Sequence, residues 1–95
     1  MATATKRKFK LGQVVVTTGA IDAFLRNRTD HRPFVKRHQS GDWGDVAADD
    51  VRENVCALVQ GLQIMSAYTL QDGTRLLVVT EADRGATTVL LPQEY

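Results

Sequence analysis

The chain has 95 residues, 43% of them hydrophobic and 24% charged, which suits one soluble domain with a single core. No apolar run approaches the roughly 20 residues of a membrane span, and the start, MATATKRKFK, lacks the apolar stretch of a secretory signal. The lone cysteine, Cys56, cannot form an internal disulfide, which favours a cytoplasmic location. Its apolar helical surroundings predict a buried, inert thiol.

The N-terminal part of the chain predicts a tail, a strand and two helices. Residues 1–8 are small, polar and basic and are expected to be disordered, so the folded domain spans residues 9–95. The β-branched run 13–17 predicts a strand, and the apolar periodicity after it predicts a helix that reaches about Asn27. Pro33 suits the first position of a short second helix.

A third helix is expected between the paired acids at 49–50 and Gly61, which is a typical helix stop. Val51, Val55 and Leu58 recur at helical spacing. This stripe is predicted to be the face that packs on the core.

The remainder predicts an antiparallel meander of three strands, at 62–70, 75–80 and 87–91. Asp72-Gly73 is a strong hairpin signal between the first two, and the polar turn 81–85 joins the last two. The order β-α-α-α-β-β-β predicts an α+β domain, with an antiparallel sheet of three to four strands packed against helices.

Charge is distributed unevenly along the chain, although the net charge is only +1. Residues 1–40 carry nine lysines and arginines and two acids, whereas residues 41–95 carry three arginines and nine acids. If the two parts intermix in the fold, their charges cancel. If they stay apart, the basic face suits an anionic partner or head-to-tail self-association.

Two dense polar segments, residues 38–45 and 80–88, hold the candidate functional residues. Both interrupt regular elements with similar chemistry, so their loops at 40–45 and 81–85 are expected to lie on the same side of the sheet and to share contacts. The predicted binding residues are Trp43, Glu81, Asp83, Arg84, Thr87 and Thr88.

Several stretches of the chain are similar to those of a known protein family. They are residues 13–20, 37–38, 41–45, 66–68, 72–74, 80–84 and 87–95. On these stretches, about residues 9–95 resemble a family of small plasmid-related bacterial proteins borne on mobile genetic elements. The resemblance implies a mobile-element setting and implies no activity. Gly85 departs from the family, which has a serine there, and this argues against a chemical need for a hydroxyl at that position.

His38 allows a catalytic interpretation. It precedes Asp42 by four residues and Asp45 by seven, so a carboxylate could orient the imidazole as a general base, while Arg37 could hold a phosphate. That arrangement would suit a small hydrolase or nuclease. The favoured alternative is that His38 only caps the C-terminal end of the second helix.

The other candidates also have two interpretations. Trp43 could stack on a base or enter a partner's pocket, or it could simply cover the core. Arg84 could serve a site, or pair with Glu81 or Asp83 within the turn. Four carboxylates could gather around Mg²⁺ if the two polar segments met, but no spacing matches an EF-hand or a zinc site. We therefore predict no metal and no cofactor. The four are Asp42, Asp45, Glu81 and Asp83.

The sequence thus favours a small cytoplasmic accessory protein of a mobile element that acts by binding. Its partner would be a host or defence protein, or nucleic acid, without membrane association, and a homodimer is left open. The alternative is a small hydrolase or nuclease that uses His38, Arg37 and the nearby carboxylates.

Overall fold

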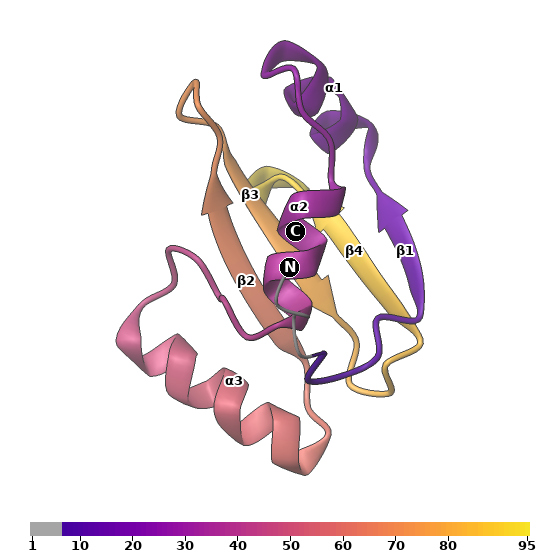
Figure 1. The fold of residues 1–95 in the computed structure, drawn as a ribbon, viewed down its shortest axis with the longest axis vertical. Coiled ribbons are helices and arrows are strands. Elements are labelled where there is room, and N and C mark those ends of the chain that lie inside the picture. The colour runs from indigo at the N-terminus through magenta and orange to yellow at the C-terminus, as the bar shows by residue number, and fades with distance from the viewer. Residues whose placement is uncertain (1–6) are drawn as a thin grey trace, which may run out of the picture.

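The structure is a computed structural model that describes residues 7–95, so the tail predicted at residues 1–8 lies largely outside it. One α+β domain contains three α-helices and a four-stranded sheet (Figure 1). The elements in chain order are β1 (Gln13–Val16), α1 (Thr18–Arg26), α2 (Arg32–Gln39), α3 (Ala48–Gln60), β2 (Ile64–Thr69), β3 (Arg75–Thr80), β4 (Ala86–Leu90) and a 3-10 turn at Pro92–Glu94.

The strand order is β1-β4-β3-β2, and the sheet is mixed. The meander β2-β3-β4 is antiparallel, as predicted, but β1 pairs with β4 in parallel, with Gln13 opposite Ala86 and Val16 opposite Val89. The expectation of a wholly antiparallel sheet is therefore wrong. A parallel pair needs a long crossover between its strands, and here the three helices and two further strands provide it.

The main core lies between the sheet and the first two helices. α2 crosses one face of the sheet, while α1 lies beyond the end of β1 (Figure 1). Alternate residues of the strands point to the α2 side, so Tyr68, Leu76, Val78 and Val89 meet Phe24 there. Thr17 begins α1 by accepting the amide hydrogen of Ala20, and residues 18–26 then place the apolar side of α1 on this core.

α3 lies beside β2 and covers its outer edge (Figure 1). The side-chain amide of Asn54 donates to the carbonyl of Met65 at 2.7 Å and accepts its N–H at 3.1 Å, as a neighbouring strand would. Next along the edge, Ala67 exchanges backbone hydrogen bonds with Trp43 and Asp45. The outward backbone groups of Met65 and Ala67 are thus paired, which covers this part of the sheet edge.

The predicted inward stripe of α3 is wrong for two of its three residues, because only Leu58 packs against the core. Val51 and Val55 are 37% and 53% exposed, while Asn54 and Ala57 are buried. The helix lies at a sheet edge, so its buried side must present a hydrogen-bonding amide and a small residue instead of a broad apolar stripe. Cys56 is also exposed, which contradicts the predicted buried thiol.

Candidate functional site

His38 is the centre of a buried chain of polar side chains. α2 holds the ring over the sheet with 0% exposure, where Nδ1 lies 2.6 Å from the Ser66 Oγ and Nε2 lies 2.8 Å from the Thr80 Oγ1. Thr80 Oγ1 lies 2.7 Å from Thr87 Oγ1, and the Thr87 hydroxyl donates to the carbonyl of Leu11. The network crosses β2, β3 and β4 and ends on the segment before β1.

The last hydrogen bond determines the direction of all the others. The single hydroxyl hydrogen of Thr87 goes to Leu11, so its oxygen must accept the hydrogen of Thr80. Thr80 then has no hydrogen left for His38, and Nε2 must be the donor between them. Nδ1 accepts from Ser66. The network therefore selects a neutral imidazole with its hydrogen on Nε2.

The environment of His38 is consistent with a neutral ring. Burial, with a smaller contribution from the positive charge of Arg84, lowers the pKa of His38 to about 3. The interpretation of His38 as a helix cap is wrong, because the ring points into the core and bonds to two strands. Burial also leaves no path by which a substrate could reach either nitrogen.

Arg37, Asp42 and Asp45 brace α2 and the following segment against β2. Arg37 Nε donates to Asp42 Oδ2 at 2.7 Å, and the Arg37 guanidinium lies 4.6 Å from the centre of the Tyr68 ring. The Tyr68 hydroxyl donates to the carbonyl of Asp42 at 2.6 Å, and the Thr69 hydroxyl donates to Asp45 Oδ2 at 2.8 Å. These groups, considered above for catalysis, already have partners inside the domain.

Trp43 belongs to a second, smaller core. It is 7% exposed and packs with Ala57 and Ile64. Its ring stacks on Phe9 with 6.3 Å between centroids, and the edge contact with His38 is 6.0 Å. The indole therefore covers the core and is not free to stack on a nucleic-acid base.

Arg84 caps the C-terminal end of α3. Its guanidinium donates to the carbonyls of Ala57, Leu62 and Glu81 at 3.0, 2.6 and 3.0 Å. The side-chain pairing predicted within the turn is wrong, because Arg84 bonds to backbone oxygens and not to the carboxylates. The carboxylate of Asp83 instead accepts the amide hydrogen of Gly85. The hydrogen bonds of Arg84 fix the β3–β4 turn against the end of α3.

The two polar segments share the hydrogen bond between His38 and Thr80, whereas the loops 40–45 and 81–85 within them meet only through an aromatic ring. The guanidinium of Arg84 lies 5.7 Å from the centre of the Phe9 ring, which stacks on Trp43. Among residues 7–95, no hydrogen bond or ion pair joins 40–45 directly to 81–85. Thr87 is part of the buried network, and Thr88 faces the other side of the sheet. The segments are close neighbours but form packing rather than an open site.

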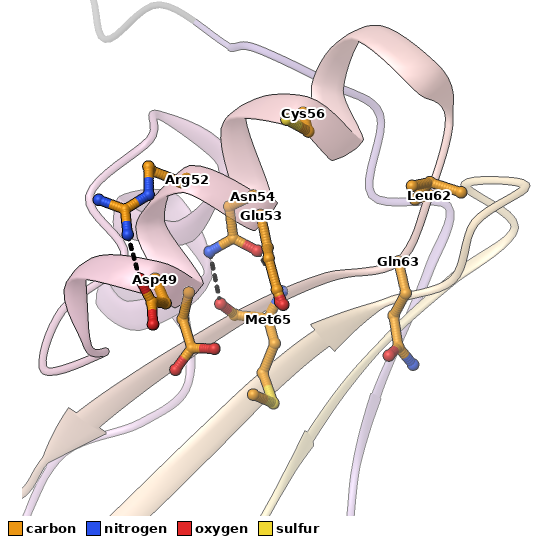
Figure 2. Close-up of a pocket in the computed structure, with 9 residues that line it drawn as sticks. Asp49, Arg52, Glu53, Asn54, Cys56, Leu62, Gln63 and Met65 are labelled. Carbon is orange, nitrogen blue, oxygen red and sulfur yellow. Dashed lines mark hydrogen bonds and ion pairs between the residues drawn. The ribbon is translucent and has the colours of Figure 1, made fainter.

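A hollow of about 610 Å³ between α3 and the start of β2 collects acidic side chains (Figure 2). Asp49, Asp50 and Glu53 line it, and Asp49 pairs with Arg52. Within the described part of the chain, no three His, Cys, Asp or Glu side chains are grouped so that they could hold a metal ion. The carboxylates considered for Mg²⁺ therefore do not converge: Asp42, Asp45, Glu81 and Asp83.

A basic groove runs between α2 and β1. Its cavity of about 690 Å³ has Val14 and Val35 among its lining and gathers Arg7, His31, Arg32 and Lys36 around them. No carboxylate is part of this lining. We call these residues the basic groove. Sequence reasoning did not identify them as a site, and the only signal for them was the excess of positive charge over residues 1–40.

The cations of the basic groove differ in how far they are neutralised. Arg32 is paired with Asp30 through two hydrogen bonds of 3.0 and 3.1 Å, and this contact lowers the pKa of Asp30 to about 2. Within residues 7–95, Arg7 and Lys36 form no salt bridge. The groove therefore keeps an excess of positive charge that an anion could neutralise.

Searches against protein-family models, curated proteins and solved structures find no match to this chain. In the part of the chain that the structure covers, no helix is both long and apolar enough to cross a membrane.

Proposed function

We propose that this chain is a small cytoplasmic accessory protein of a mobile genetic element that acts by binding a negatively charged partner. The partner is a host or defence protein, or a nucleic acid. The binding surface is the basic groove between α2 and β1.

The observation that carries this proposal is the gathering of Arg7, His31, Arg32 and Lys36 around one hollow without a lining carboxylate. The positive charges of Arg7, Arg32 and Lys36 add at one hollow, and such a potential attracts anions and accelerates their association. Arg and Lys donate to phosphates and carboxylates alike, so the groove chemistry suits both classes of partner.

The surroundings of His38 support binding over hydrolysis. A general base must come within hydrogen-bond reach of the proton that it removes, and its pKa works best near the ambient pH. The His38 ring is fully buried, uses both nitrogens within the core and has a pKa of about 3. The arrangement that suggested a hydrolase is better explained as structural.

The test is binding of fluorescent polyanions at about 50 mM salt, with a DNA duplex and a polyglutamate peptide as separate probes. We expect at least one of them to bind, and the affinity to fall steeply as salt is added. For the duplex, Lys36→Glu should reduce the slope of log K against log salt by about 1, because one phosphate contact is lost.

Arg75→Glu is the matched control, since it makes the same change of charge at an exposed site on β3 outside the groove. If neither probe binds, or if Lys36→Glu and Arg75→Glu weaken binding equally, the groove is not the binding surface and the proposal fails.

A further inference from the structure

The two edges of the sheet are treated differently. Along β2, Asn54 pairs with Met65, and Trp43 and Asp45 pair with Ala67, so this edge is covered over Met65 and Ala67. β1 is the opposite outer strand, and among residues 7–95 no helix or strand lies beyond it (Figure 1). An open edge of this kind is a template for another strand.

The backbone of β1 is arranged to accept such a strand. Gln13 and Thr17 donate their amide hydrogens to Gly85 and Val89 of the β4 side. Backbone groups alternate in direction along a strand, so Val14 and Val16 point their N–H and C=O groups away from β4. The edge contains no proline and no charge, the usual features that block strand addition.

The two sides of this edge have different chemistry. On the α2 side lies the basic groove, of which Val14 is part of the wall. On the other side of the sheet Val15 is 41% exposed. A strand placed beside β1 would direct alternate side chains to the cationic groove and to the side of Val15.

We propose that an extended acidic segment of a partner protein adds to β1 as an additional strand. Its acidic side chains, at alternate positions, face the basic groove, and its apolar side chains lie beside Val15. The backbone of the segment pairs with the outward groups of Val14 and Val16. This inference rests on the anion binding proposed for the groove and names its partner.

Other occupants match the edge less well. Nucleic acid could contact the cations, but its phosphates have no donor for the free carbonyls of Val14 and Val16. A second copy of this chain could pair through its own β1, but residues 13–17 contain no carboxylate to neutralise the groove. An acidic strand satisfies the backbone and the charge together.

The experiment compares two fluorescent peptides of the same composition, about ten residues long to match an extended strand. In one, glutamate and valine alternate; in the other, the glutamates are contiguous. If only charge attraction acts, the two peptides should bind with equal affinity, whereas strand addition should give the alternating peptide the higher affinity. We expect the alternating peptide to bind more tightly by at least about tenfold, as two or more net hydrogen bonds would give.

Val14→Pro tests the backbone contact. The Val14 amide points away from β4, and proline is tolerated on edge strands when the missing N–H faces outward. We expect this variant to weaken binding of the alternating peptide about threefold to tenfold more than binding of the contiguous peptide, the range for one lost hydrogen bond. Slowed amide exchange at Val14 and Val16 on adding the alternating peptide gives the same answer without a variant.

The outcomes separate the two proposals. Equal binding of both peptides, with no protection of Val14 and Val16, overturns strand addition but leaves anion binding standing. Preference for the DNA duplex over both peptides also overturns it and makes nucleic acid the partner. If no anionic probe binds, both proposals fail. A concentration-dependent dimer that excludes the peptide would instead make the second copy the occupant.

Discussion

Replacing His38 by alanine should remove a large part of the stability of the domain. His38, Ser66 and Thr80 are all 0% exposed, and the imidazole is the link between the two hydroxyl groups. In His38→Ala, both hydroxyls lose a partner in a place that water does not reach, at about 1–3 kcal/mol each, and the removed ring leaves a cavity. We expect a loss of about 3–5 kcal/mol in the free energy of unfolding.

The assay is urea unfolding, followed by the fluorescence of Trp43 and by circular dichroism. Trp43 is the only tryptophan, and its ring centre lies 6.0 Å from that of His38, so the signal reports on this part of the core. His31→Ala is the control, because His31 is only partly buried and its loss should change stability by no more than about 0.5 kcal/mol.

A graded variant keeps the test informative if His38→Ala does not fold. The amide of glutamine can reach the position of Nε2 but not that of Nδ1, so His38→Gln should keep the bond to Thr80 and lose the bond to Ser66. Its stability should lie between wild type and His38→Ala. Equal stabilities of His38→Ala and His31→Ala would refute the argument that the buried network supports the fold.

Three further predictions concern acid, glycine and the cap of α3. The pKa of His38 is about 3 in the folded state and near 6.5 in the unfolded state, so the unfolded state takes up the proton first as the pH falls. The free energy of unfolding should therefore decrease between pH 6.5 and pH 3, by up to about 1.4 kcal/mol per pH unit. His38→Gln has no imidazole and should lack this part of the pH dependence. Gly44 and Gly61 both have a positive φ, of 73° and 69°, but only at Gly44 would an added Cβ clash with a neighbour, the carbonyl of Ala67. Gly44→Ala should therefore lower the melting temperature more than Gly61→Ala. Equal decreases would argue against the clash. Arg84→Ala removes the charged donor of the Leu62 carbonyl, while the Ala57 carbonyl keeps the amide hydrogens of Gly61 and Leu62. The variant should cost about 1–3 kcal/mol in urea unfolding, whereas unchanged stability would mean that water replaces the guanidinium.

Local patterns in the sequence predicted most of the elements. The β-branched run before Thr17, Pro33 in the first turn of α2 and Gly61 at the end of α3 each specify a boundary through their own backbone preferences. The apolar run at 76–79 and the Asp72-Gly73 turn predicted the antiparallel hairpin. These features depend on residues close in the chain, so they can be predicted from short stretches of sequence.

The functional interpretation failed where it depended on which distant residues meet. The spacing of His38 and Asp42 suggested a dyad, but the imidazole bonds to hydroxyls on β2 and β3, and Asp42 bonds to Arg37. The apolar valines of α3 suggested an inward face, but this helix covers a strand edge, where the amide of Asn54 is the useful group. The spacing of residues along the chain shows neither the hydrogen-bond partners of His38 nor the side of α3 that is buried.

The sequence by itself determined the element order, the α+β class and the excess of positive charge in residues 1–40. Only the tertiary structure decided that β1 runs parallel to β4, that His38 is buried and neutral, and that Arg7 and Lys36 line one groove beside an open strand edge. The physical reason is that local backbone preferences act over a few residues. Hydrogen-bond partners, desolvation and the summed field of cations depend on distances across the fold.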